Sequence, residues 1–155
     1  MSKAIEILNF EEGYEVNPYR DSLGFPTVAG GIRIGPKGAS LSNYTFTVPR
    51  EVGDVWKQSI LNEKITYAKK YSNIQQALAS CNDARKDVIY SMMYQLGVDG
   101  LAAFKNTLKS IANGDFDGGA DGMLNSLWAK QTPNRAKRHA QVMRSGTYDA
   151  YKGLL

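Results

Sequence analysis

The sequence predicts an α+β protein in which a small antiparallel sheet is confined to one early stretch and helices make up most of the rest. Two observations carry this prediction. Between Tyr14 and Ile34, glycines and prolines alternate with aromatic and β-branched residues, which is typical of short strands joined by tight turns. From Thr47 onward, apolar residues recur with the helical period. A length of 155 residues, with 43% hydrophobic and 22% charged residues, indicates one water-soluble globular domain.

The first predicted helix precedes the sheet. It spans Ser2 to Phe10, with Ser2 as a candidate cap and Gly13 as the residue that ends it. After the sheet, the segment from Pro36 to Thr47 is polar and contains glycine, which predicts a loop.

A long helix is predicted to follow this loop. Thr47 can cap it, Pro49 suits a first turn, and Glu51 favours a helix N-terminus. The apolar period then continues to about Tyr71, which makes this helix long enough to join two lobes. Turn signals separate five further predicted helices, over residues 74–80, 83–96, 99–112, 116–128 and 134–143.

The residues that most often bind metals or act as nucleophiles are scarce. Cys81 is the only cysteine, which excludes an internal disulfide and suits a reducing cytoplasm, and we expect it to be a packed thiol. His139 is the only histidine and is expected on the surface of a basic helix. The acidic residues after Asp115 lack the spacing of a calcium loop, so Asp115 is expected to cap a helix. We therefore expect no metal and no cofactor.

The formal charge of +4 is concentrated at the C-terminus. Residues 130–155 contain six Lys or Arg and one Asp, whereas the preceding residues are nearly neutral. This distribution suits an anionic partner such as a bacterial envelope, or it reflects a solvated helical face. Nucleic acid is disfavoured because aromatic residues are not interleaved with the basic run. Residues 1–10 lack the apolar stretch of a signal peptide or a membrane span, so we expect synthesis without export and no stable membrane insertion.

Three polar residues suggest chemistry. Eight residues separate Glu12, at the end of the first helix, from Asp21, and five more separate Asp21 from Thr27. A glutamate at the end of a buried helix can stay protonated while an aspartate on a solvated turn stays ionised, and such a pair can cleave a glycosidic bond. The threonine hydroxyl can help the aspartate hold a water. Taken alone, the pattern equally fits caps and solvated charges.

These residues and three longer runs resemble the lysozymes of tailed bacteriophages, the endolysins of glycoside hydrolase family 24, and most of all those of the T-even phages. The runs are Y-Q-L-G-V-D-G-L-A-A-F over 94–104, W-A-K-Q-T-P-N-R-A-K-R over 128–138 and R-S-G-T-Y-D-A-Y-K over 144–152. The resemblance implies a lysozyme-like fold over the single domain 1–155. A sheet lobe of about 13–48 and a helical lobe of 73–155 with 1–12 would be joined by a helix over 49–72.

The resemblance also implies a function. The protein would be a muramidase that cleaves the β-1,4 bond between N-acetylmuramic acid and N-acetylglucosamine in peptidoglycan. Glu12 would be the general acid, and Asp21 with Thr27 would position or activate a water that attacks from the opposite face, with inversion. Saccharide or peptide contacts, or cleft walls, would include Tyr94, Gln95, Thr107 and Trp128, and Arg135 would lie near Glu12.

The same resemblance implies a monomer that folds in the host cytoplasm and reaches the wall through a holin-type membrane lesion, for host cell lysis. The alternative is a non-catalytic wall-binding protein that retains the fold.

Two departures from the family pattern stand out. Ile32 replaces a polar residue, and Ser59 is the expected facing position on the long helix, so a polar bridge between sheet and helix would be missing. Gly122 replaces a substrate-binding amide. Together with Gly118 and Gly119, Gly122 predicts a soft helix, since each glycine lowers helix stability by about 1 kcal/mol relative to alanine.

Overall fold

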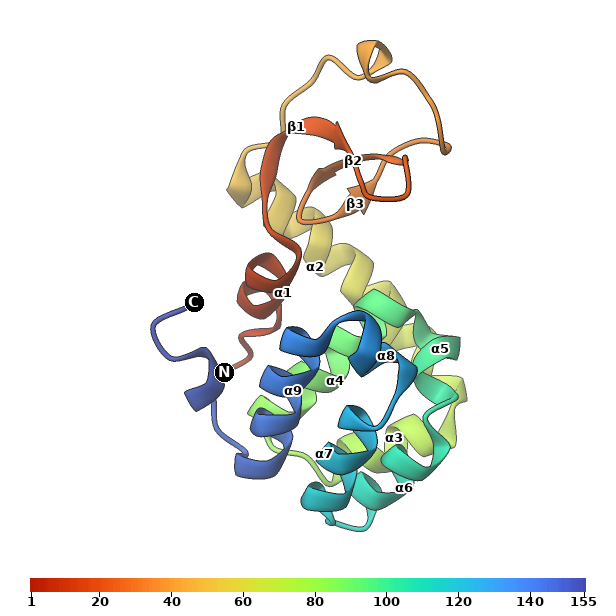
Figure 1. Ribbon diagram of the computed structural model, residues 1–155, viewed down its shortest axis with the longest axis vertical. Coiled ribbons are helices and arrows are strands. Elements are labelled where there is room, and N and C mark those ends of the chain that lie inside the picture. The colour runs from red at the N-terminus through yellow and green to blue at the C-terminus, as the bar shows by residue number, and fades with distance from the viewer. The chain divides into compact units, whose positions relative to one another are not determined.

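Three antiparallel strands and nine α-helices confirm the predicted α+β class (Figure 1). The computed structural model describes residues 1–155. The strands are β1 (Glu15–Arg20), β2 (Pro26–Ala29) and β3 (Ile32–Arg33). The α-helices are α1 (Ala4–Glu12), α2 (Arg50–Tyr67), α3 (Ser72–Ala79), α4 (Asp83–Leu96), α5 (Val98–Ala102), α6 (Lys105–Ala112), α7 (Phe116–Leu124), α8 (Leu127–Gln131) and α9 (Pro133–Ser145). Short 3-10 turns are η1 (Leu41–Asn43), η2 (Ala68–Lys70) and η3 (Asp149–Tyr151).

The chain divides into two compact units. The sheet unit consists of Leu8–Ile60, and the helical unit consists of Met1–Ile7 with Leu61–Leu155. The division falls within α1 and within α2, so each of these helices contributes residues to both units.

The sheet unit is built around β2, the central strand. Thr27 on β2 pairs with Tyr19 on β1 and with Arg33 on β3. Consecutive residues of a strand face opposite sides, and all four residues of β2 are buried. An apolar cluster of Val28, Ala29, Ile32 and Val48 is buried in this unit. The Tyr14 hydroxyl donates to the backbone oxygens of Val48 and Pro49, each at 2.8 Å, which holds the start of the sheet against the start of α2.

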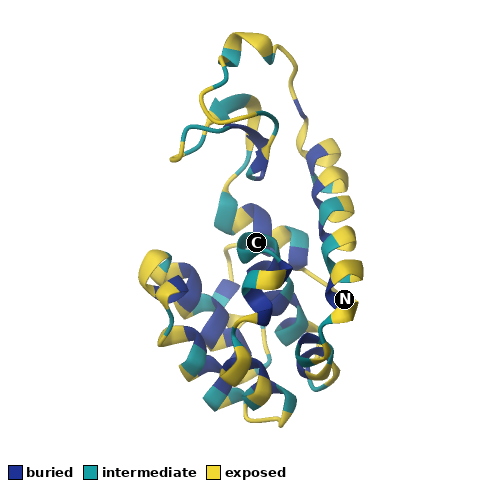
Figure 2. Cartoon of the chain, turned by 90° about the vertical axis from the view of Figure 1, so that its right-hand side faces the viewer, coloured by how far each residue is buried: buried dark blue, intermediate teal, exposed yellow.

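The helical unit packs around α4. Half of this fourteen-residue helix is buried, as the apolar residues between Val88 and Leu96 predict, and Gly97 with a φ of +78° ends it. The other helices bury one face each and expose the opposite face, which Figure 2 shows as alternating dark blue and yellow. The aromatic residues at the C-terminus pack against this unit, as predicted: Tyr151 is buried, and Tyr148 donates to Asp87 at 2.5 Å.

Two predicted helices are each divided in the structure. The helix expected over 99–112 is α5 and α6, and the break lies at Phe104, whose backbone leaves the helical region to place its ring against Trp128 with centroids 6.4 Å apart. The helix expected over 116–128 is α7 and α8. Ser126 separates them because its extended backbone and its side chain cap α8, accepting the N–H of Ala129.

The structure confirms two further local predictions, at Asp115 and Cys81. Asp115 caps α7, since its carboxylate accepts the Gly118 N–H at 2.9 Å. Cys81 is a packed thiol in the core, and burial raises its pKa to about 11.

The expectation that His139 lies on the surface is wrong, because its side chain is fully buried. Basic residues surround His139 in the sequence, but the helical period turns His139 inward together with Ala136, Ala140 and Met143.

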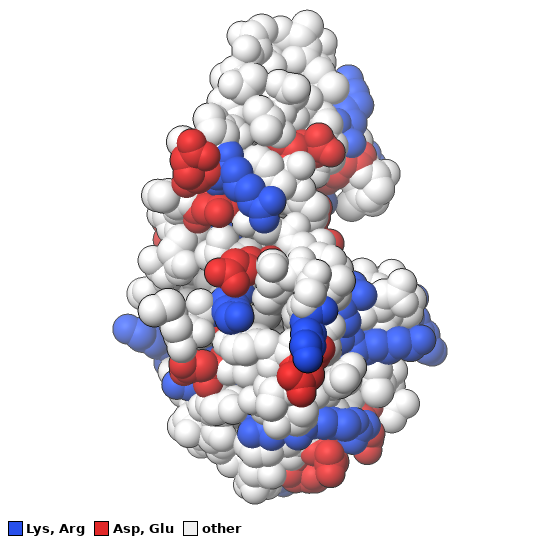
Figure 3. Space-filling view, turned by 90° about the vertical axis from the view of Figure 1, so that its left-hand side faces the viewer, with Lys and Arg blue, Asp and Glu red and all other residues white.

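The basic C-terminus is less available to a partner than its charge suggests. Arg135 is buried, and Arg144 forms ion pairs with Asp117 and Asp121. On the face of the molecule that Figure 3 shows, basic and acidic side chains are interspersed and do not gather into one basic patch. None of the helices combines the length and the hydropathy that crossing a membrane requires.

Candidate active site

Glu12 is the last residue of α1, and its side chain lies over the turn between β2 and β3. Gly13 ends the helix with a φ of +73°, in the left-handed region. A Cβ atom built on Gly31 would be 3.2 Å from Glu12 Oε2 and 3.6 Å from its Cδ. Gly31 itself has a φ of +84°, so the turn needs glycine for its backbone and for the room it leaves to the Glu12 carboxyl.

Asp21 begins a tight turn whose backbone holds its carboxylate. Asp21 Oδ1 accepts the N–H groups of Leu23 and Phe25, each at 2.9 Å, and Arg33 Nε donates to Oδ2 at 3.2 Å. The hydrogen bond from Phe25, with those from Leu23 and Arg33, lowers the pKa of Asp21, although partial burial acts in the opposite direction. Asp21 is therefore ionised at neutral pH, as predicted for an aspartate on a turn.

Thr27 is connected to Asp21 through the backbone of Phe25. The Thr27 hydroxyl donates to the Phe25 carbonyl oxygen at 2.8 Å, and the same oxygen accepts the Asp21 N–H at 2.9 Å. Thr27 is only 1% exposed, so its hydroxyl is fixed by the sheet. The structure thus brings Asp21 and Thr27 to one turn, and their joint action on a water stays a prediction.

Glu12 and Asp21 both lie near Tyr19, which the sequence analysis did not single out. Burial raises the pKa of Tyr19, and the negative charges of Glu12, Glu15 and Asp21 raise it further. Tyr19 therefore stays protonated in the neutral range and can donate a hydrogen bond beside the two candidate carboxyls. Tyr19 precedes Asp21 by two residues, and residues two apart on a strand lie on the same face, so the sequence could have indicated that Tyr19 lies near Asp21.

Arg33 is a second residue that the sequence analysis missed. Besides donating to Asp21, its guanidinium lies 4.0 Å from the centre of the Phe25 ring. The pairing of Arg33 with Thr27 across the sheet places it there. The signal is weak in the sequence because the register of a strand of two residues cannot be deduced from alternation.

Tyr94, Gln95 and Trp128 lie in the helical unit. Trp128 Nε1 donates to Gln95 Oε1 at 2.8 Å, so α8 and the end of α4 are joined at this point. Trp128 is only 3% exposed, yet it lines an apolar pocket of about 370 Å³ together with Leu96, Ala103, Phe104, Ser126, Leu127 and Gln131. Tyr94 is half-buried one residue before Gln95.

Thr107 is buried in α6 against α7. A Cβ atom built on Gly122 would lie 2.3 Å from Thr107 Oγ1. The Thr107 hydroxyl therefore occupies the space that a side chain at position 122 would need. Of the two roles expected for Thr107, this buried position fits part of a cleft wall better than a direct contact to the saccharide.

Arg135 is buried in α9 and bonded to α4. Its Nη2 donates to the backbone oxygen of Ser91 at 3.2 Å and to Ser91 Oγ at 2.8 Å. The proximity of Arg135 to Glu12, which the resemblance implies, stays a prediction.

A comparison with known proteins shows relatives over nearly the full length of the chain. No family model matches. Two proteins of Dictyostelium discoideum, named probable T4-type lysozyme 1 and 2, are 28% and 24% identical to the chain, over 98% of it and 99% of their own length. The chain is thus similar over nearly its whole length to proteins named T4-type lysozyme. The pre-baseplate central spike protein Gp5 of Enterobacteria phage T4 is 24% identical over 94% of the chain, which corresponds to 28% of that protein.

The departure from the family pattern expected at Ile32 places an apolar side chain in the core of the sheet unit. Ile32 is 5% exposed and belongs to the apolar cluster of the sheet unit. Ser59, the expected facing position on α2, is exposed. The helical period turns Gly53, Lys57 and Ile60 inward instead, and Lys57 is the buried polar side chain of this stretch.

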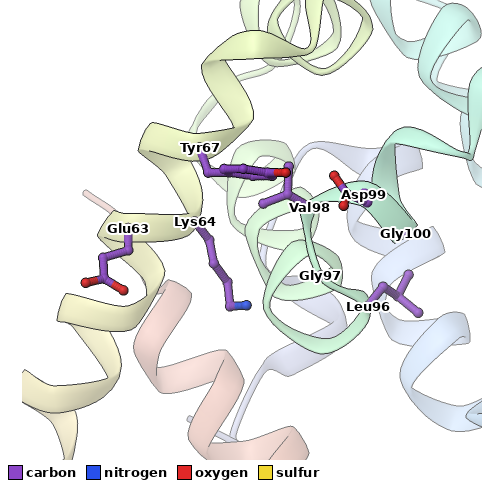
Figure 4. A pocket seen from close by; sticks show the side chains of 8 residues that line it. All are labelled: Glu63, Lys64, Tyr67, Leu96, Gly97, Val98, Asp99 and Gly100. Carbon is purple, nitrogen blue, oxygen red and sulfur yellow. The ribbon is translucent and has the colours of Figure 1, made fainter.

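A larger pocket of about 530 Å³ lies elsewhere in the helical unit, between the C-terminal half of α2 and the start of α5. Figure 4 shows Tyr67 extending from α2 toward Val98 and Asp99 and Lys64 extending toward the turn at Gly97, whereas Glu63 points away from the other side chains. Tyr71 donates to Asp99 next to this pocket. None of the predicted site residues lines it.

Proposed function

We propose that this chain is a muramidase that hydrolyses the β-1,4 bond between N-acetylmuramic acid and N-acetylglucosamine in bacterial peptidoglycan. The observation that carries the proposal is the pair of Glu12 and an ionised Asp21 beside the same phenol, that of Tyr19. The proposal is also supported by the similarity of nearly the whole chain to proteins named lysozyme.

In this mechanism the two carboxyl groups have opposite roles. Glu12 acts as general acid and gives its proton to the glycosidic oxygen, whose bond to the sugar C1 breaks. Asp21 takes a proton from a water whose oxygen bonds to C1 from the opposite face, and Thr27 orients that water. The product has the inverted configuration, and inverting enzymes typically separate their carboxyl groups by about 6.5 to 9.5 Å.

The hydrogen bonds to Asp21 support its role as the base that stays ionised. A carboxylate that accepts two backbone N–H groups and an arginine is held in one orientation. The lowered pKa of Asp21 keeps it available throughout the neutral range. The same lowering limits its strength as a base, so orientation of the water and electrostatic stabilisation of the developing positive charge accompany the proton transfer to Asp21.

The helical unit would supply saccharide and peptide contacts. Gln95 is held by Trp128, and the pocket beside Trp128 offers an apolar surface for a sugar ring. Tyr94 would contribute to the same contacts, and Thr107 and Arg135 would support them from buried positions.

In its biological role the enzyme would be an endolysin that lyses the host cell. It would fold as a monomer in the host cytoplasm and reach the wall once a holin-type lesion opens the membrane. The basic C-terminal residues would add some attraction to the anionic envelope, reduced by the burial of Arg135 and the ion pairs of Arg144.

Analysis of the products released from purified peptidoglycan tests the reaction. Hydrolysis gives fragments with a reducing end, and inversion gives the α anomer first, which proton NMR detects before the anomers equilibrate. Anhydro fragments would indicate a transglycosylase, initial release of the β anomer would refute inversion, and binding without any product would identify the non-catalytic alternative.

A further inference from the structure

Lys57 is a buried charged side chain that the proposed mechanism does not use. It lies on α2 in the sheet unit, is fully buried, and its Nζ donates to Asn9 Oδ1 at 3.0 Å. Asn9 is 5% exposed and in turn donates through Nδ2 to Asp54 Oδ1 at 2.7 Å. A continuous hydrogen-bonded chain therefore joins α2 to α1. Lysine is almost never fully buried without such partners, because burial removes its ammonium group from water.

The space for Lys57 comes from Gly30. A Cβ atom built on this residue would lie 1.7 Å from Lys57 Nζ and 2.5 Å from its Cε. No side chain fits at position 30 while Lys57 holds its place. The end of the lysine thus takes the room of the missing side chain and lies directly against the turn between β2 and β3.

The neighbouring residue of the same turn contacts Glu12. Glu12 Oε2 lies 3.2 Å from the position of a Cβ on Gly31, so Lys57 and Glu12 rest on consecutive glycines. Asn9 and Glu12 are also three residues apart on α1, which places them on the same face of that helix. Lys57 therefore contacts both parts of the structure that determine where the Glu12 carboxyl lies, the last turn of α1 and the turn after β2.

We propose that Lys57 is a positioning residue for Glu12, an inference that rests on the proposed function. Through Asn9 and Gly30 it fixes α1 relative to the turn between β2 and β3, and so fixes the direction in which Glu12 presents its proton. The general acid must lie within hydrogen-bonding distance of the leaving oxygen, and a displacement of about 1 Å can reduce the rate about 100-fold. Removing the Nζ contacts should therefore slow the chemical step and leave saccharide binding almost unchanged.

The first variant is Lys57→Met, which keeps the apolar stem and removes Nζ. The second, Lys57→Leu with Gly30→Ala, shortens the side chain at position 57 and fills the vacated space with the alanine methyl group, so the apolar volume is nearly conserved. Lys109→Met is the matched control, since Lys109 is exposed on α6 in the other unit. Circular dichroism and urea unfolding show which variants are folded, and kcat and KM are measured on soluble, uncrosslinked peptidoglycan strands.

We expect both folded variants to lose at least ten-fold in kcat with KM within two-fold of the wild type, and the control to match the wild type. The second variant should recover stability relative to Lys57→Met without recovering kcat. A kcat within three-fold of the wild type in either folded variant would overturn the proposal, because Lys57 would then only fill space. Failure of both variants to fold would also overturn it, by making Lys57 a requirement of the fold itself. Absence of cleavage by the wild type would instead contradict the proposed function.

Discussion

His139 lies at the centre of a buried hydrogen-bonded chain. Its Nε2 is 2.7 Å from Ser91 Oγ and its Nδ1 is 2.9 Å from the Tyr151 hydroxyl. Because Ser91 Oγ already accepts a hydrogen bond from Arg135, its own proton is available to Nε2. The tautomer that satisfies these groups carries its proton on Nδ1 and donates it to Tyr151. Burial, and then the positive charges of Arg135 and Arg138, lower the pKa of His139 well below its ordinary value, so the ring is neutral.

This buried neutral histidine makes the stability of the protein depend on pH. Below a pH of about 6.5 the unfolded chain binds a proton at His139 that the folded chain does not bind, so the free energy of unfolding falls as the pH is lowered from about 6.5 to 5. The expected slope from this residue approaches about 1.4 kcal/mol per pH unit.

Urea unfolding of the wild type and of His139→Gln at several pH values measures this effect. The variant is expected to be less stable at pH 7.5, because it cannot reproduce both hydrogen bonds, and to show a flatter dependence between pH 6.5 and 5. Parallel pH profiles of the two proteins would contradict a buried neutral His139.

The glycines of helix α7 are weak helix formers, but the packing of this helix requires them. The sequence predicts a soft element because three of its nine residues are glycines. In the structure a Cβ on Gly119 would lie 2.5 Å from Ile111 Cγ1, and one on Gly122 would lie 2.3 Å from Thr107 Oγ1. The missing side chains therefore allow α7 to approach α6 closely, and packing takes precedence over propensity.

A substitution at position 122 separates the effect of helix propensity from the effect of packing against α6. Alanine has the better helix propensity by about 1 kcal/mol, but overpacking against Thr107 typically costs about 1 to 3 kcal/mol. We expect Gly122→Ala to lower the free energy of unfolding, and Gly122→Ala combined with Thr107→Ala to recover most of the loss, since the colliding Oγ1 is gone. Urea unfolding of the two single variants and the double variant gives the coupling. A single Gly122→Ala variant more stable than the wild type would show that the glycine only softens the helix.

The elements differ in how far the sequence could predict them. The bounds of α4 were predicted from its apolar period and the Gly97 stop, and the sheet from its glycines and prolines, because these signals are local. The break at Phe104 could not be predicted, since it depends on the contact with Trp128 in a distant helix. The cap at Ser126 is a local signal that the apolar pattern around it concealed.

At the scale of the whole molecule, the candidate site also shows that local signals are predictable from the sequence and that contacts between distant residues are not. Glu12, Asp21 and Thr27 are recognisable because they lie close together in the sequence at a characteristic spacing. The contact of Lys57 with Asn9 joins residues 48 positions apart and has no spacing to reveal it. The accessible positive charge of the C-terminus could not be predicted from the sequence either. It is lower than the number of basic residues suggests, because the fold buries Arg135 and pairs Arg144 with Asp117 and Asp121.

The central claim is that the protein cleaves peptidoglycan with Glu12 as the proton donor. The most direct test compares the wild type, Glu12→Gln and the matched control Glu6→Gln, an exposed position on the same helix, in the clearing of chloroform-treated Gram-negative cells. The account predicts that Glu12→Gln folds and binds the wall but clears at a rate reduced at least 100-fold, while Glu6→Gln clears like the wild type. Undiminished clearing by folded Glu12→Gln would contradict it.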